Sequence, residues 1–183
     1  MHRYLTLLLL VAFGSSSVLM TNGDFEQDLS VGWSQIVSGS NTSIERSTTF
    51  DPDPDYEAYA YKGTGDGYAE LYQMTYIPTT DLDFSASLKL YASSNSTTCW
   101  AAGAFVISYL NDTGDLLGES IIYFASSACT WTNTPTRHLI PAADSNWHNY
   151  SFNINSELSN LSGVNPTNIA CIELSLYGFA DSG

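Results

Sequence analysis

The side chains best suited to chemistry in this sequence are aromatic. Aromatic residues make up 13% of the 183 residues, including 12 tyrosines and 4 tryptophans. A flat ring can cover the apolar C–H face of a sugar ring while polar neighbours bond the sugar hydroxyls. The alternative is that tyrosine rings simply pack on a sheet, for which they are well suited. Five tyrosines fall on predicted neighbouring strands, where they could form a ligand platform: Tyr59, Tyr61, Tyr68, Tyr72 and Tyr76.

The tryptophans divide into two pairs by their surroundings. Trp100 and Trp131 stand in Ser/Thr-rich segments near predicted loop ends, and they are further candidates for ligand binding. Trp33 and Trp147 adjoin or open predicted strands and are expected to anchor the core. Ligand-binding rings are therefore expected on a strand face and on the loops beside it.

Alternating carboxylates form a second group with chemical potential. Asp51, Asp53, Asp55 and Glu57 alternate in a run stiffened by prolines. Carboxylates spaced in this way can converge on a calcium ion, which takes about six to eight oxygen ligands. The run lacks the glycine of an EF-hand loop, so a solvated acidic loop is the alternative interpretation.

Residues for catalysis are sparse. Beyond His2, only His138 and His148 supply imidazoles, and neither a Gly-x-Ser-x-Gly elbow nor a helical metal-binding histidine pair is present. A glycosidase needs two carboxylates about 5 to 10 Å apart, and the sequence alone does not place any pair at that separation. We therefore expect no active site within these residues, with a hydrolase fragment as an open alternative.

The N-terminal segment has the pattern of a secretory signal peptide. Arg3 precedes a short apolar run over residues 5–13, and small polar residues follow as far as Ser17. A membrane anchor would need about 20 apolar residues, roughly twice this run, and no later segment is apolar enough to span a bilayer. We predict that residues 1–17 are removed and that a single domain, residues 18–183, is secreted to the outside of the cell or its surface.

The charge balance limits the possible partners. The formal net charge is −14, and loss of Arg3 would make it −15. Nucleic acid is excluded as a partner, because its recognition needs cationic side chains that neutralise phosphates. Neutral ligands such as sugars, or cations such as calcium, suit this electrostatic field better. Only four fixed cationic residues would remain: Arg46, Lys62, Lys89 and Arg137.

Three cysteines belong to the predicted exported domain. Cys99 and Cys129 lie in Ser/Thr-rich loop sequence, and in an oxidising compartment we favour a disulfide between them over three free thiols. Cys171 lies within an apolar strand pattern and is expected to be a buried thiol.

Alternation with period two predicts strands over most of the chain. In residues 68–77, Ala69, Leu71 and Ile77 share one face while the tyrosines share the other, and residues 84–92 alternate in the same way. About seven strands separated by turn residues predict an all-β protein, an antiparallel two-sheet β-sandwich. Further strands are expected at residues 101–110, 120–125, 147–154 and 169–177, with one helical turn within 155–162.

The order of several landmarks adds a family resemblance. Asn22-Gly-Asp-Phe-Glu26 is followed by Gly32-Trp33 and then by Gly67-Tyr-Ala-Glu-Leu-Tyr-Gln73. Later come Phe105-Val-Ile-Ser-Tyr-Leu110 and the strand that Trp147 opens. Over residues 20–183 this series resembles jelly-roll carbohydrate-binding modules with a galactose-binding-domain-like fold, of the xylan- or β-glucan-binding type.

The resemblance implies a non-catalytic, monomeric module that binds a polysaccharide or oligosaccharide and often holds a structural calcium ion (Ca²⁺). It implies Asp24 and Glu26, at the first strand, as calcium ligands, with an Asp partner on a final strand. The sequence reaches Gly183 where that strand should begin, so we expect a fragment that lacks its final strand. A catalytic domain could then follow downstream.

Three functions are consistent with these observations. The first is a carbohydrate-binding module that attaches a secreted protein to a polysaccharide, and it predicts a row of solvent-facing aromatic rings. The second is a structural or adhesive module of a cell-surface or matrix protein, which predicts no such row and loops of plain Ser, Thr and Asn. The third is a fragment of a secreted glycoside hydrolase or lyase, which predicts a cleft with two close carboxylates.

Overall fold

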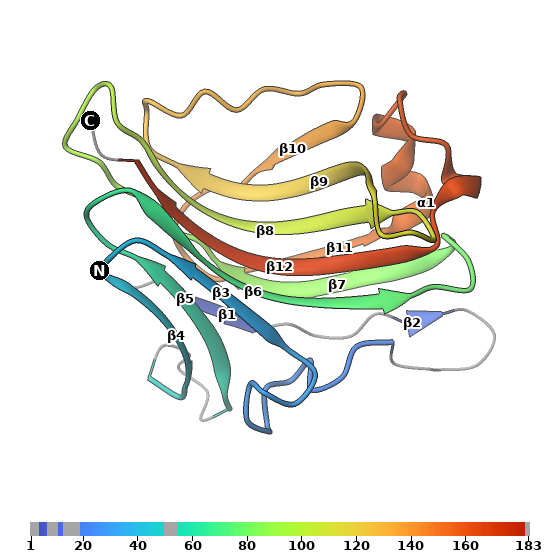
Figure 1. The fold of residues 1–183 in the computed structure, drawn as a ribbon, viewed down its shortest axis with the longest axis horizontal. Helices are drawn as coiled ribbons and strands as arrows, with labels where there is room; N and C mark the ends of the chain where they lie inside the picture. Colours follow the sequence, from blue (N-terminus) through green and yellow to red (C-terminus); the bar gives the residue numbers. More distant parts are fainter. Residues whose placement is uncertain (1–3, 7–10, 13–18, 50–54, 182–183) are drawn as a thin grey trace.

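The alternating segments fold into two stacked β-sheets (Figure 1). The computed structural model describes residues 4–6, 11–12, 19–49 and 55–181. Sheet A contains, in spatial order, β11 (His148–Asn153), β7 (Leu82–Lys89), β1 (Tyr4–Thr6), β5 (Glu57–Lys62) and β4 (Thr42–Ser47), with β2 (Val11–Ala12) also paired to β7. Sheet B contains β10 (Arg137–Pro141), β9 (Leu116–Ala125), β8 (Ala101–Leu110), β12 (Cys171–Ala180), β6 (Gly67–Tyr76) and β3 (Ser34–Ser38). The predicted β-sandwich is confirmed.

The alternation assigns faces as predicted. In β7, Phe84, Ala86 and Leu88 are buried between the sheets. In β6, Ala69 and Leu71 are buried on the inner side, so Tyr68 and Tyr72, which flank them, lie on the outer side. Strands β6 and β7 therefore divide their residues between the core and the outer surface.

Strand boundaries and direction differ from the expectation in two respects. The predicted strand at residues 169–177 is β12, which runs to Ala180 and pairs with both β6 and β8 along its whole length. Because β12 is paired on both edges, the strand extends beyond the apolar run.

β10 pairs parallel to β9, whereas all other strand pairs that the structure describes are antiparallel. The long connection over residues 126–136 returns the chain to the start of β9, so both strands run in the same direction.

One continuous hydrophobic core joins the sheets. The rings of Phe84 in sheet A and Phe105 in sheet B lie 5.5 Å apart, centroid to centroid, and both are almost fully buried. Trp33 is 5% exposed and packs in the same core, as predicted. Trp147, which was expected to anchor the core as well, is only half-buried just before β11.

The Asn22–Trp33 segment, which carried part of the family resemblance, is a structural loop. The Asn22 side chain is buried; its amide group donates to the carbonyl of Asp28 at 3.1 Å, and its Oδ1 accepts from the backbone N–H of Gln27 at 2.9 Å. Its own carbonyl accepts from the Trp33 indole at 3.0 Å. A short amide side chain tolerates the positive φ of 52° found there. The motif thus directs Phe25 and Trp33 into the core.

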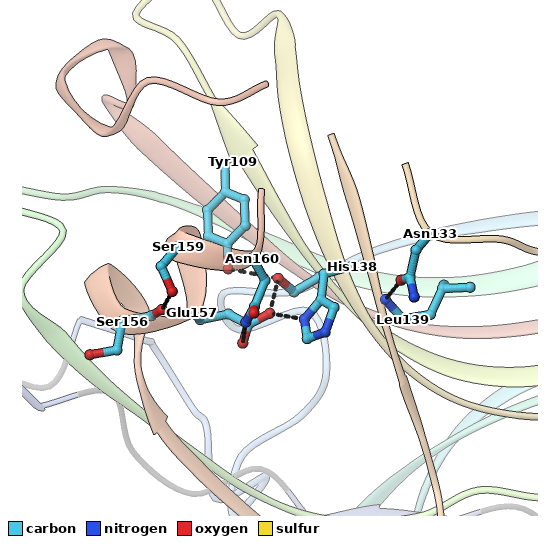
Figure 2. A network of polar contacts seen from close by, with 9 residues as sticks. Tyr109, Asn133, His138, Leu139, Ser156, Glu157, Ser159 and Asn160 are labelled. Carbon is cyan, nitrogen blue, oxygen red and sulfur yellow. Dashed lines mark hydrogen bonds and ion pairs between the residues drawn. The ribbon is translucent and has the colours of Figure 1, made fainter. Parts of the chain in front are cut away.

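A short helical segment closes one end of the sandwich through a polar network (Figure 2). It consists of α1 (Ile154–Glu157) and the 3₁₀ turn η1 (Leu158–Asn160), within the predicted helical region; a second 3₁₀ turn, η2 (Pro166–Asn168), precedes β12. Glu157 Oε1 accepts from the Ser120 hydroxyl at 2.8 Å and lies 2.5 Å from His138 Nδ1. The Tyr109 hydroxyl lies 3.1 Å from that of Ser120. The network ties the helical segment to sheet B.

The predicted signal peptide contributes two short strands to sheet A. β1 lies between β7 and β5, and β2 pairs with β7. The rest of residues 1–17 lies outside the described residues, as do Asp51 and Asp53 of the acidic run. Removal of residues 1–17 stays a prediction. In the parts of the chain that the structure describes, no helix is long and apolar enough to cross a membrane.

Candidate functional site

The outer side of sheet B gathers aromatic side chains from neighbouring strands. The register pairs Phe179 of β12 with Tyr68 of β6, and it pairs Tyr177 with Ala104 of β8, which in turn pairs with Tyr123 of β9. Residues paired in this way project on the same side of a sheet. We call this surface the aromatic face, and its rings are Tyr68, Tyr72, Tyr76, Tyr123, Trp131, Tyr177 and Phe179.

Several rings of the aromatic face contact their neighbours. Tyr68 and Tyr177 have centroids 5.6 Å apart, and Tyr177 and Phe179 are stacked at 6.3 Å with 14° between their planes. Toward β9, the rings of Trp131 and Tyr123 meet edge to face, with their centroids 5.7 Å apart. Each separation lies in the range of favourable ring pairs, so neighbouring rings hold one another in place.

The Trp131 loop builds a wall along this face. Ala104, Ile121 and Leu139 point outward from sheet B and yet are buried, with Trp131 packed against them. Asn133 Oδ1 accepts from the Leu139 backbone N–H at 2.7 Å and so fixes the loop to β10 (Figure 2). A groove of about 240 Å³ remains on the face, and it is lined by Glu70, Val106, Ser108, Glu119, Ile121, Trp131, Arg137, Ser175 and Tyr177.

Carboxylates lie among these rings. Burial raises the pKa of Glu70, and a hydrogen bond from Ser175 partly counters that rise. Burial also raises the pKa of Glu173, and the charge of Glu70 adds to the increase. Glu119 instead accepts a 2.5 Å hydrogen bond from Arg137 Nε. The groove therefore combines apolar surface with acceptors for ligand hydroxyl groups.

Tyr177 lies at the centre of these contacts. Burial raises the pKa of its hydroxyl to about 12, with further increases from the charge of Glu70 and from Tyr68. The phenol therefore stays protonated near neutral pH and can donate a hydrogen bond from the floor of the groove. Neither Tyr177 nor Phe179 was among the sequence candidates. Continuing the alternation through residues 171–180, where odd-numbered residues point outward, would have found both.

The structure brings together only part of the predicted platform. Tyr68, Tyr72 and Tyr76 lie on the outer side of β6, as predicted. Tyr59 and Tyr61 lie on β5 in the other sheet, stacked on each other at 5.9 Å, so their assignment to the same platform was wrong.

The separation arises because the chain crosses from sheet A to sheet B between β5 and β6. Gly67, the first residue of β6, has a φ of +132°, and a Cβ added to it would lie 2.1 Å from the Ser38 carbonyl oxygen at the end of β3. Glycine alone tolerates this close approach, which allows β6 to begin beside β3 in sheet B.

The two loop tryptophans meet at the edge of the aromatic face. Trp100 precedes β8, and its ring lies 4.5 Å from that of Phe179. It also meets Trp131 edge to face at 5.3 Å. Both predicted loop candidates thus extend the row of rings that begins on β6.

The calcium ligands suggested by the resemblance are already engaged in other contacts. Asp24 and Glu26 are exposed on the loop after Asn22. Asp24 Oδ1 accepts from the Glu26 backbone N–H at 3.3 Å, and Glu26 Oε1 accepts from the Tyr56 backbone N–H at 3.2 Å. Within the described ranges, no group of three or more His, Cys, Asp and Glu side chains is placed to hold a metal ion. Two carboxylates do not fit a site that wants about six to eight oxygens, so calcium binding stays a prediction.

The predicted disulfide between Cys99 and Cys129 is absent from the structure. Backbone bonds between Ala101 and Ser126 close the β8–β9 pair, and the cysteines lie beyond that point in separate turns. Cys99 Sγ is buried 3.6 Å from the Thr98 hydroxyl, whereas Cys129 is half-buried in a turn closed by its N–H on the Ser126 carbonyl. Cys171 is buried, as predicted.

The polar network at the helical end has the residue types of an acid–base site but not the access. Ser120 is fully buried, and its hydroxyl already donates to Glu157. Glu157 also accepts from the Asn160 amide at 3.1 Å and is 8% exposed (Figure 2). A buried, mutually satisfied cluster of this kind stabilises the fold. The other sequence candidate, His148, pairs with the exposed Asp144 at 2.7 Å.

Comparison with known proteins gives distant structural likenesses. No family model matches the chain, and no curated protein matches it. The enzymatically active domain of tailspike protein 4 from bacteriophage CBA120 is similar at 15% identity over 88% of this chain, with a TM-score of 0.47. This chain spans only 20% of that protein.

Two carbohydrate-binding modules of family 11 from Clostridium thermocellum are similar over nearly their full length. One, in complex with a β-1,3-1,4-mixed-linked tetrasaccharide, has 17% identity over 87% of this chain and 89% of its own, with a TM-score of 0.41. The other belongs to the cellulosomal cellulase Lic26A-Cel5E and has 17% identity over 86% of this chain and 88% of its own, with a TM-score of 0.40. At these values the likeness concerns the β-sandwich arrangement alone.

Proposed function

We propose that this chain binds a saccharide on the aromatic face of sheet B and thereby attaches a secreted protein to a polysaccharide. The observation that carries the proposal is the unbroken series of rings, from Tyr68 through Tyr177 and Phe179, beside a groove lined by carboxylates. Rings held by their neighbours can accept the flat faces of sugar units without first being ordered. The sequence prediction of a signal peptide supports secretion.

The charges of the face favour a neutral glycan. Glu70 and Glu173 are half-buried in or beside the groove, and the whole chain has a formal net charge of −14. A uronic acid polymer would meet like charge, whereas neutral sugar hydroxyls can donate to these oxygens. Arg137 does not reverse this preference, because it is already paired with Glu119.

The alternative of a structural or adhesive spacer predicts no row of rings on the surface, so the half-buried rings on the outer side of sheet B and the exposed Tyr76 favour saccharide binding over it. The alternative of a hydrolase is favoured by one observation, namely two half-buried carboxylates with raised pKa on the same face. Such groups can act as general acids when they lie across a scissile bond. Release of reducing ends would support this second function.

The test is affinity electrophoresis through gels that contain xylan, mixed-linkage β-glucan or soluble cellulose derivatives. We expect retardation by at least one neutral polymer without release of reducing ends. Tyr177→Ala should weaken binding by about tenfold or more, because burying the apolar surface of a large side chain contributes roughly 1.5–3 kcal/mol. Tyr177→Phe should retain most of the affinity, and Ser151→Ala on the other sheet should change nothing. Equal retardation of the wild type and Tyr177→Ala would refute the aromatic face as the site.

A further inference from the structure

A second cavity, larger than the groove, is lined by residues of both sheets. The strand ends that line it, those of β5, β8 and β12, lie at the end of the sandwich opposite α1 (Figure 1). Its volume is about 520 Å³, within the range of roughly 300–1,000 Å³ found for small-molecule sites. Its aromatic walls are Tyr61 from β5, Tyr91 just after β7 and Trp100 just before β8. We call this cavity the end pocket.

The floor of the end pocket is apolar and its rim is polar. Ala101 and Ala180, at adjoining ends of β8 and β12, line the pocket and are 6% and 8% exposed. Small side chains at both positions leave room between the three aromatic walls. Ser94, Asn95 and the exposed Asp181 supply hydroxyl, amide and carboxylate groups around the pocket. Apolar walls with a few polar groups suit a sugar unit, and the carboxylate favours a neutral sugar over an anionic one.

One side of the rim is held in shape by its own hydrogen bonds. The Ser94 hydroxyl donates to the Cys99 carbonyl at 2.8 Å. The Ser96 hydroxyl oxygen accepts from the backbone N–H groups of Thr98 and Cys99 at 3.1 and 3.0 Å. The end of β12 is fixed to the same segment, because the Asp181 N–H donates to the Trp100 carbonyl at 2.9 Å.

The opposite side is held by a buried lysine. Lys62 is 3% exposed, and its Nζ donates to the carbonyls of Ser40, Gly63 and Thr64 at 3.0, 3.2 and 3.2 Å. Burial lowers the pKa of Lys62, and the charge of Asp66 partly offsets that change. The ammonium group therefore organises the turn that forms this side of the pocket. A pocket with both rims fixed needs little further ordering when a ligand enters.

Trp100 belongs to both sites. It lines the end pocket, and its ring also contacts Phe179 and Trp131 at 4.5 and 5.3 Å. The rings on the outer side of sheet B and the aromatic walls of the end pocket therefore meet at Trp100. Because Trp100 lines the end pocket and Trp131 lines the groove, their contact places the two proposed sugar sites next to each other.

We propose that the end pocket is a second saccharide site, which takes a neutral sugar unit while the aromatic face holds another part of the same chain. The inference rests on the proposed function in that the ligand is a glycan, but it concerns different residues. Two adjacent sites on one protein raise the affinity for a long chain, because the second contact is intramolecular. Ligands too short to reach both sites gain nothing from this arrangement.

The test is nuclear magnetic resonance of alanine methyl groups during titration with cellohexaose and, separately, xylohexaose. Ala101 and Ala180 report on the end pocket, and Ala104, on the outer side of β8, reports on the aromatic face. We expect all three methyl signals to shift with one hexasaccharide. In Tyr61→Ala the shifts of Ala101 and Ala180 should be lost while that of Ala104 persists. Polymer affinity of that variant should fall about tenfold, and Tyr61→Phe should behave like the wild type.

The outcomes separate the two proposals. A shift of Ala104 alone in the wild type would overturn the end pocket and leave the proposed function standing. Shifts of Ala101 and Ala180 alone would support the end pocket and refute the aromatic face. A wild type in which neither hexasaccharide moves any of the three methyl signals would overturn both. Thermal unfolding of Tyr61→Ala checks that its loss of signal does not come from unfolding.

Discussion

The outer sides of the two sheets follow the same alternation but carry different residues. On sheet A, the register pairs Ser87 with Asn149 and Ser85 with Ser151, so the outer side of β7 and β11 is small and polar. On the outer side of β5, the structure describes one ring pair, Tyr59 with Tyr61. On sheet B, the corresponding side carries the aromatic face and its carboxylates. Both sheets bury their inner sides in one core.

This contrast shows where function can be recognised in a sandwich. The inner residues of either sheet must be apolar, because burial drives folding whatever the protein does. The outer residues need only be compatible with water, and serine and asparagine meet that need on sheet A. Large rings on the outer side of sheet B expose apolar surface that folding does not require. Exposed apolar surface of this kind marks binding sites.

The inner sides of the two sheets should contribute equally to stability, and substitutions there have the largest expected effect. Phe84→Ala in sheet A and Phe105→Ala in sheet B should each lower the free energy of unfolding by about 3–5 kcal/mol. Both rings are at most 1% exposed and they contact each other. The matched outer substitution Ser85→Ala should change stability by less than about 0.5 kcal/mol. Urea unfolding monitored by circular dichroism measures all three variants. A small loss of unfolding free energy for either phenylalanine variant would show that the two inner sides are not equivalent.

The sheets also differ in their dependence on residues 1–17, the predicted signal peptide. Sheet B is built between Ser34 and Ala180, whereas sheet A has β1 between β7 and β5. In a chain that begins at Val18, those amide hydrogens of residues 87–89 that point toward β1 should exchange about a hundredfold faster, because their neighbouring strand is gone. Amides of β12 should be unchanged. Equal protection of residues 87–89 in both chains would show that β1 does not stabilise sheet A.

The smallest expected effect concerns the carboxylates of the aromatic face. Burial and the charge of Glu70 raise the pKa of Glu173 above its ordinary value of 4.5, so the folded protein binds the proton more tightly than the unfolded chain does. Ionisation therefore weakens the fold as pH rises through the raised pKa. Glu173→Gln should raise the free energy of unfolding by about 0.5–1 kcal/mol at pH 7.

This gain should disappear below the ordinary pKa of the carboxyl group, where both states are protonated. Denaturant unfolding at pH 7 and pH 3.5 measures the difference. Asp112→Asn, at an exposed loop position, serves as the control and should change stability by less than about 0.5 kcal/mol at either pH. A gain from Glu173→Gln of the same size at both pH values would contradict ionisation as the cause.

The sequence by itself determined the class of fold and the side on which many residues lie. Alternation in residues 68–77 and 84–92 identified inner and outer residues correctly, because a strand has a fixed period of two. It also placed Tyr68, Tyr72 and Tyr76 on one surface. These are local properties of a pleated chain, so neighbouring residues suffice to predict them.

Only the tertiary structure decided which strands lie side by side. Tyr59 and Tyr61 are close to Tyr68 in sequence and yet belong to the other sheet, while Tyr177 is more than one hundred residues away and contacts Tyr68. Sheet pairing joins distant segments, and consecutive strands can enter opposite layers, as β5 and β6 do. The period of a strand is set by its own backbone, whereas its neighbours are chosen by the packing of the whole chain.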